Sequence, residues 1–371
     1  MFRHSLAAVA ALSVTAGAAA ADLPRTMIWS AYDVGSSGYT EASAIADGLM
    51  RQSDARVRIM PSGTSIGRLL PLKTGRVSYG FLANEVYFAA EALYEFSTQE
   101  WGPQDLRVLL GRPAGFGMMT AADAGIETIA DLRGKRVARV QANPSVNVKV
   151  EAILAFAGLS WDDVDVVEFP SFAASMRGVV EGVVDSAGPV PTGSIVYELE
   201  ASPRGLMWPA VPADDAEGWA RLDEIAPIFE PLAETVGAGM GEDNPAHMIG
   251  YRYPMITTYA TTSDDEVYAV TKAVVESFDL YKDVTAAMPR WDAQIAGRPV
   301  VDAPFHDGAI RYLKEIGVWT DEDQAWNDAR LERMQAVQAA WDAAMDAALE
   351  QNVPGREWGA FWDEWRAQHL N

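Results

Sequence analysis

Polar loops that follow predicted strands carry most of the residues that could bind a ligand. Each loop leads into a predicted helix, and the loops cover residues 35–39, 62–65, 143–147 and 171–172. Ligands of open α/β sheets lie beyond the carboxyl ends of the strands, and a helix N-terminus offers free N–H groups to an anion. We therefore expect these loops to bind a carboxylate or a similar anion. The candidate side chains are Ser36, Ser37, Tyr39, Ser62, Thr64, Asn143, Ser145, Asn147 and Ser171.

Four further residues complete the set of ligand candidates. Arg112 ends a predicted strand and could hold a carboxylate through two parallel hydrogen bonds. Asn84 and Glu85 open a predicted helix, and an acidic side chain at Glu85 would suit a ligand amino group. Thr192 follows a strand of the second half of the chain and could line the cleft wall.

Each candidate also has a structural interpretation. Serine, threonine and asparagine commonly cap helices, and a lone arginine is commonly a surface residue. Tyr39 could pack against its neighbours, and Glu85 could simply favour a helix start. Because several loops are expected to converge on one cleft, we favour ligand binding for the set as a whole.

Catalytic and metal-binding motifs receive little support. After residue 21 the histidines are His247, His306 and His369, which lie far apart and lack the spacing of a metal site. The sequence contains no nucleophile elbow, P-loop or dinucleotide fingerprint. We therefore predict a binding protein with no catalytic residues, no metal and no cofactor. A hydrolase remains the rival hypothesis of a different class.

Composition narrows the possible partners. The formal net charge of −23 argues against nucleic acid, whose binding depends on lysine and arginine. An anionic ligand is still allowed, because net charge does not describe the local field of a pocket. The chain has no cysteine, so disulfides and thiol chemistry are excluded and a large bacterial periplasmic protein is favoured.

The first residues have the pattern of a secretory signal. Arg3 and His4 precede an apolar stretch, and Ala19 and Ala21 favour cleavage before Asp22. The stretch is too short for a spanning helix, and without cysteine no lipid anchor is expected. We predict a signal peptide at residues 1–21, periplasmic localisation, no membrane insertion and a monomer.

Short strand-like runs alternate with helical periods along the mature chain. Strands are expected at residues 25–31, 57–60 and 77–82, with helices at 40–52 and 85–95. Residues 107–119 and 251–258 are expected to cross between two units of the chain. This alternation predicts an α/β fold.

Three stretches carry a family resemblance. Residues 304–319 read PFHDGAIRYLKEIGVW, residues 62–85 join a Ser-Gly-Thr-Ser loop to a helix and a strand, and residues 129–159 contain Asp-Leu-Arg-Gly-Lys-Arg-Val. In this order they resemble the TAXI family, the solute receptors of TRAP transporters. Residues 141–147 and 30–40 lack glycines that are usual in this family, so its substrates are not transferred to this chain.

The resemblance implies a two-lobed periplasmic binding protein of a type II-like fold, with a hinge and a ligand cleft between the lobes. It also implies a TRAP membrane subunit as partner. From the polar loops we expect a small organic anion as ligand, namely a carboxylate, a dicarboxylate or an amino acid such as glutamate. An ABC-transporter receptor or a receptor that serves a sensor kinase is the alternative. The expected division is residues 22–113 and 251–327 for lobe 1 and 114–250 for lobe 2.

Residues 328–371 are predicted to form a C-terminal helical extension. Trp358, Phe361, Trp362 and Trp365 recur at helical spacing and form an apolar stripe. We expect this stripe to pack on a lobe. The alternative is an aromatic surface that docks onto the transporter or onto a second receptor.

Overall fold

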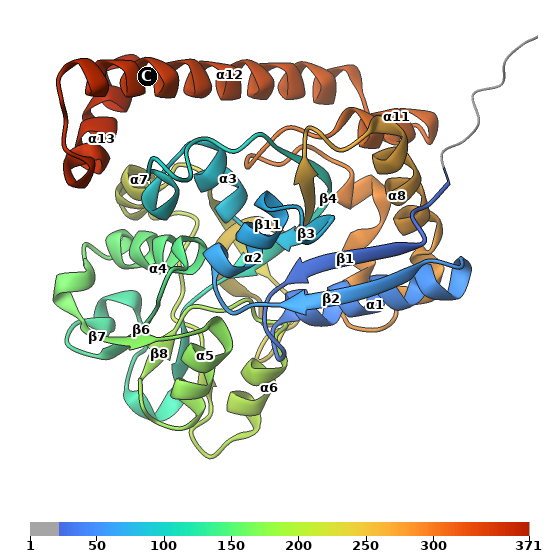
Figure 1. The fold of residues 1–371 in the computed structure, drawn as a ribbon. Helices are drawn as coiled ribbons and strands as arrows, with labels where there is room; N and C mark the ends of the chain where they lie inside the picture. Colours follow the sequence, from blue (N-terminus) through green and yellow to red (C-terminus); the bar gives the residue numbers. More distant parts are fainter. Residues whose placement is uncertain (1–21, 371) are drawn as a thin grey trace, which may run out of the picture.

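The computed structural model describes residues 22–370, so the predicted signal peptide lies outside the described residues. The chain forms two α/β lobes, each built on its own sheet, and a long helical arm lies over one side of them (Figure 1). Between residues 22 and 370, no helix combines the length and the apolar character that crossing a bilayer requires.

Lobe 1 contains a six-stranded sheet whose order is β10-β11-β3-β1-β2, with β4 paired to β11. Strands β1, β2 and β3 are parallel, whereas β11 runs antiparallel to β3. The strands are β1 (Thr26–Ala31), β2 (Arg56–Pro61), β3 (Tyr79–Leu82), β4 (Leu106–Phe116), β10 (Glu230–Glu234) and β11 (Ala246–Tyr259). The main helices are α1 (Ser37–Gln52), α2 (Ser65–Lys73), α3 (Glu85–Ala90), α8 (Asp264–Glu276), α9 (Phe278–Tyr281), α10 (Ala293–Ala296) and α11 (Asp307–Glu315).

Lobe 2 repeats this arrangement with a five-stranded sheet of order β7-β6-β8-β5-β9. Its first three strands are again parallel, and β5 runs antiparallel to β8. The strands are β5 (Met119–Ala121), β6 (Arg136–Val140), β7 (Asp165–Phe169), β8 (Ser186–Ala187) and β9 (Leu206–Met207). The helices are α4 (Pro144–Phe156), α5 (Phe172–Val180), α6 (Ser194–Ala201) and α7 (Ala216–Ile225).

Two long antiparallel strands connect the lobes. Strand β4 has 11 residues and β11 has 14, and they pair from Leu106 opposite Tyr259 to Phe116 opposite Ile249. Both crossings expected from the sequence therefore exist as strands. The expected lobe boundaries at residues 113 and 250 fall inside these two strands.

One predicted helix is shorter in the structure than its sequence suggests. Residues 85–95 were expected to be one helix, but α3 ends at Ala90. Ala92 and Tyr94 both adopt a φ of 52°, which turns the chain out of the helix. A short 3₁₀ helix over Tyr94–Phe96 follows. The helical period thus continues in the sequence beyond the point where the backbone leaves the helix.

The C-terminal extension consists of α12 (Asp321–Glu350) and α13 (Trp358–His369), which folds back beneath the end of α12 (Figure 1). Trp341 packs edge-on against Trp358 and Trp362, with ring centroids 4.8 Å apart in both pairs. The indole of Trp362 donates a hydrogen bond to the Ala92 carbonyl of lobe 1, over 2.8 Å. The structure therefore uses the aromatic stripe for packing.

The predicted fold class is confirmed. Two lobes with the same strand order, two connecting strands and a packed C-terminal extension form the α/β architecture of a two-lobed binding protein. In this structure the lobes are closed onto each other, so the candidate site is a junction filled by side chains from both.

Candidate functional site

Three of the candidate residues cap helices. Ser36 accepts a hydrogen bond from the Tyr39 amide, Thr64 from the Gly67 amide and Ser171 from the Ala174 amide, over 3.2, 2.9 and 3.2 Å. Capping satisfies N–H groups that the first turn of a helix leaves free. These three hydroxyls therefore hold the loops at the lobe junction in place.

Asn147 closes a turn inside lobe 2. Its side-chain oxygen accepts from the Val140 amide over 2.9 Å, and its nitrogen donates to the Val140 carbonyl over 2.7 Å. Both groups of the amide are used between β6 and α4. The contacts of Asn147 are thus those of a structural residue.

Asn143 joins the two lobes. Its side-chain oxygen accepts hydrogen bonds from the Tyr32 hydroxyl over 3.1 Å and from Ser65 over 2.7 Å, and its nitrogen donates to the Gly63 carbonyl over 3.3 Å. Asn143 opens α4 of lobe 2, whereas its three partners belong to lobe 1. It occupies the cap position but makes no side-chain cap bond, because its amide is used across the junction.

The backbones of the two lobes approach each other closely beside Asn143. The Phe172 amide of lobe 2 donates to the Gly63 carbonyl over 2.9 Å. A Cβ atom at Gly63 would lie 2.2 Å from the Cβ of Ser171, so only glycine fits between the lobes here. The Ser62–Ser65 loop and Ser171 therefore meet across the junction.

A buried ion pair lies behind this contact. Nη2 of Arg68 lies 2.7 Å from Oε1 of Glu85, and both side chains are fully buried. The two atoms face each other without the alignment of a hydrogen bond. Burial lowers the pKa of Arg68, but the attraction of Glu85 prevails and holds it above its ordinary value. The Tyr32 ring covers the guanidinium, with its centroid 3.3 Å from Cζ.

A second pair of charges is connected through Asn84. The Lys149 ammonium of lobe 2 donates to Oδ1 of Asn84 over 2.6 Å, and Nδ2 of Asn84 donates to Asp302 over 2.8 Å. Lys149 also donates to the backbone carbonyl of Ser145 and to its hydroxyl. Because Lys149 can only donate and Asp302 accepts, the orientation of the Asn84 amide is fixed.

The pKa values of this second pair move toward neutrality. Burial lowers the pKa of Lys149 to about 7, although Glu85 and Asp302 act to raise it. Burial raises the pKa of Asp302 to about 6, although the hydrogen bond from Asn84 and the charge of Lys149 act to lower it. Desolvation of the charged forms is the dominant cause in both cases.

Arg68, Glu85, Lys149 and Asp302 form what we call the junction quartet, and at most 1% of each residue is exposed. In its ionised form the quartet carries two positive and two negative charges. Three of its members come from lobe 1, and only Lys149 comes from lobe 2. Closure of the lobes therefore completes the charge balance of the quartet.

Some polar atoms near the junction are buried without a partner among residues 22–370. They include Oδ2 of Asp302, the hydroxyl of Tyr253 and the hydroxyl of Thr192. Buried polar atoms are nearly always hydrogen-bonded, so each exception needs an explanation. A ligand that donates and accepts hydrogen bonds would explain these atoms, because it would pair with them.

Arg112 has a different environment from the one expected. It is buried, and its Nε and Nη2 pair with the carboxylate of Glu41, which also accepts from the Trp291 indole over 2.8 Å. Its remaining Nη1 donates to the Pro113 carbonyl over 2.9 Å. All three nitrogens are thus used inside lobe 1, and this geometry supports a structural ion pair instead of a ligand anchor.

Of the candidate residues, Glu85 is a member of the quartet, and Asn84, Asn143 and Ser145 lie beside it. Ser37 is buried and Tyr39 is half-buried in the first turn of α1, and Ser62 is half-buried in the loop before α2. Sequence reasoning missed Arg68, Lys149 and Asp302. Lys149 follows Ser145 by one helical turn, as Arg68 follows Thr64, so i to i+4 spacing from the expected loop residues was the available signal.

Residues 22–370 contain no group of three or more histidine, cysteine, aspartate or glutamate side chains placed to hold a metal ion. The chemistry of the junction is that of charge pairing and hydrogen bonding. Such a site can bind and orient a small polar ligand.

Comparison with known proteins gives a match to the NMT1-like family over residues 34–317. Among solved structures, the alkanesulfonate-binding protein SsuA from Xanthomonas axonopodis pv. citri, bound to MOPS, has 15% identity and a TM-score of 0.46, covering 86% of this chain and 95% of that one. An ancestral arginine-binding protein bound to arginine has 14% identity and a TM-score of 0.42, with coverage of 70% and 98%. The amino acid ABC transporter substrate-binding protein AbpA from Streptococcus pneumoniae, bound to L-arginine, has 9% identity and a TM-score of 0.40, with coverage of 72% and 95%.

Proposed function

The chain belongs to the NMT1-like family, and on this premise we propose that it is a solute-binding receptor that captures a small organic acid between its lobes. The observation that carries the proposal is the junction quartet, which is buried between two lobes connected by the long strands β4 and β11. Buried charges lower stability unless they are well paired. A set of buried charges that two lobes share, next to unpartnered polar atoms, is better explained by ligand binding than by stability.

The charge balance of the quartet indicates which kind of acid fits. A dicarboxylate would leave the closed junction with excess negative charge, which is costly in a dry environment. An acid that also carries an amino group adds less negative charge, because its ammonium offsets one carboxylate. Its carboxylate would pair with Arg68 and its ammonium with Glu85, in place of their poorly aligned contact. Among the ligand classes considered, an amino acid such as glutamate is therefore favoured.

The export pattern of residues 1–21 and the TAXI resemblance support a periplasmic receptor that delivers its ligand to a TRAP membrane subunit. An ABC transporter or a sensor kinase as partner is the alternative, and a neighbouring gene for a large integral permease would distinguish them. A periplasmic hydrolase is the remaining, less favoured alternative.

Ligand capture can be tested on the purified protein with L-glutamate, succinate and ethanesulfonate as probes. We expect L-glutamate to raise the melting temperature most, because a ligand that binds only the folded state stabilises it. Native mass spectrometry should show one unchanged ligand per chain. Arg68→Met should weaken binding about a hundredfold, since truncating one partner of a buried charge pair typically costs 2–5 kcal/mol.

The matched control is Arg133→Met, which removes an arginine from an exposed ion pair with Asp163. It should leave probe affinity unchanged. Binding of succinate in preference to L-glutamate would contradict the amino acid assignment. Conversion of a bound probe would contradict the receptor function itself.

A further inference from the structure

The C-terminal extension lies beyond the family match, which ends at residue 317, yet it reaches the residues beside the ligand site. Helix α12 passes over α3 on the outer side of lobe 1 (Figure 1). Helix α3 is only six residues long, and Asn84 and Glu85 stand at its start. The short helix thus has one end in the junction quartet and the other beneath the extension.

Glu91, directly after α3, is held by three arginines of the extension. Arg330 donates to Oε1 over 2.8 Å, and Arg333 and Arg366 each donate to Oε2 over 2.8–2.9 Å. The Glu91 carboxylate is 1% exposed. We call Glu91 with Arg330, Arg333 and Arg366 the arginine clamp. It connects both α12 and α13 to the end of α3.

Arg330 makes a second contact with the ligand site. Its Nη2 donates to the backbone carbonyl of Asp302 over 3.1 Å, and Asp302 is the residue that accepts from Asn84. One guanidinium therefore bridges the end of α3 and the segment that holds the start of α3. A planar guanidinium with several donors suits such bridging.

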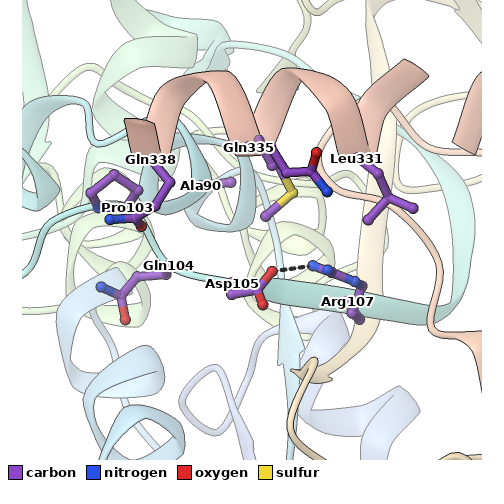
Figure 2. A pocket seen from close by; sticks show the side chains of 9 residues that line it. Ala90, Pro103, Gln104, Asp105, Arg107, Leu331, Gln335 and Gln338 are labelled. Carbon is purple, nitrogen blue, oxygen red and sulfur yellow. Dashed lines mark hydrogen bonds and ion pairs between the residues drawn. The ribbon is translucent and has the colours of Figure 1, made fainter. Parts of the chain in front are cut away.

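The other flank of α12 is packed more loosely. Figure 2 shows Leu331, Gln335 and Gln338 of α12 facing Ala90 and the Pro103–Arg107 segment across a hollow of about 220 Å³. Side chains do not fill this space. The arginine clamp, the contact of Arg330 with the Tyr87 ring and the hydrogen bond of Trp362 to Ala92 connect the extension to α3 and the residues after it.

We propose that the C-terminal extension is a positioning element of the ligand site. Through Arg330 and Glu91 it fixes α3 and Asp302 in the arrangement that presents Asn84 and Glu85 to the ligand. The predicted effect of the extension on ligand affinity rests on the proposed function, whereas its predicted effect on the position of α3 does not. Coupling of this kind is carried by contiguous contacts between packed elements.

Arg330→Gln tests this role, because it removes the bridge and leaves Glu91 two arginines. Amide hydrogen exchange of the full chain without ligand should become about tenfold faster over residues 84–90 and stay unchanged in lobe 2. The affinity for L-glutamate should fall by a similar factor, which is within the range of typical site-to-site coupling. Arg330→Lys, which keeps the charge near Glu91, should restore part of the protection.

The control is Arg298→Gln, which breaks the ion pair with Asp323 at the start of the same helix and does not touch α3. It should leave exchange over residues 84–90 at the wild-type rate. If Arg330→Gln does not fold, Arg366→Gln perturbs the clamp from α13 and is judged by the same measurement.

Unchanged exchange over residues 84–90 in the clamp variants would overturn the proposal, as would equal acceleration throughout the chain, which indicates general destabilisation. If wild-type protein binds no L-glutamate, the proposed function loses its support. The exchange comparison between Arg330→Gln and Arg298→Gln still decides the positioning role.

Discussion

The junction quartet and the arginine clamp both bury carboxylates beside arginines. The pKa shifts favour the neutral forms of Lys149 and Asp302 in the quartet but the charged form of Glu91 in the clamp. In the quartet, two pKa values move toward neutrality, to about 7 for Lys149 and about 6 for Asp302. In the clamp, burial would raise the pKa of Glu91, but the hydrogen bonds and charges of its arginines prevail and lower it to about 2.

The difference lies in how completely the carboxylates of each region are paired. Glu91 pairs with three arginines of the C-terminal extension, so the ionised form of its carboxylate is stabilised. The quartet has equal numbers of both charges, draws on two lobes and leaves Oδ2 of Asp302 without a partner. The fully paired carboxylate of Glu91 indicates a structural element, whereas the incompletely paired carboxylate of Asp302 leaves room for a ligand.

Removing the clamp carboxylate should have the largest effect. We expect Glu91→Ala to lower the free energy of unfolding by about 3–5 kcal/mol, because it leaves three buried or half-buried arginines without their partner. Urea unfolding monitored by tryptophan fluorescence measures this change. Glu332→Ala, at an exposed position of α12, is the control and should change stability little. A loss below about 1 kcal/mol for Glu91→Ala, the range of exposed ion pairs, would contradict the clamp.

On the acid side of neutrality the two regions should also respond to pH in opposite directions. The lowered pKa of Glu91 stabilises the fold above its ordinary value of 4.5, and this contribution is lost as the pH falls toward about 2. The raised pKa of Asp302 makes stability fall as the pH rises from 3.8 to about 6. The lowered pKa of Lys149 makes stability rise from about pH 7 to 10.5.

Lys149→Met combined with Asp302→Asn should remove the pH dependence of stability that arises from Asp302 and Lys149. The stability of wild-type protein relative to this double variant should be lowest between pH 6 and 7, with slopes of at most about 1.4 kcal/mol per pH unit on either side. Urea unfolding at fixed pH values measures the difference. If this stability difference does not change between pH 4 and 10, the charged groups of the quartet are as well stabilised as Glu91 in the clamp.

The smallest effects should separate two asparagines at the start of α4, Asn143 and Asn147. Asn147→Ala should lower the free energy of unfolding by about 1–2 kcal/mol, because it removes two hydrogen bonds within lobe 2. The radius of gyration should not change. Asn143→Ala removes contacts between the lobes and should shift the protein toward a more open form, visible by small-angle X-ray scattering. Equal scattering from both variants would show that Asn143 does not hold the lobes together.

The sequence predicted which loop residues stand at helix starts better than it predicted which charged residues pair with each other. Strand ends and cap residues are local features, so Ser36, Thr64 and Ser171 could be placed at helix starts. Arg112 was expected to end a strand and face a ligand, but it lies inside β4, and its partner Glu41 is 71 residues away. Arg68 and Lys149 were passed over because a single charged residue on a helix looks like a surface residue until its neighbours are known.

The sequence by itself determined the alternation of strands and helices, the two crossings and the amphipathic extension, because each depends on residues close together in the chain. Only the tertiary structure decided which charges are paired. Asn84 meets Lys149 and Asp302 from positions 65 and 218 residues away, and Glu91 meets arginines from more than 230 residues away. Such pairings depend on how the lobes and the extension pack, and no local spacing in the sequence records them.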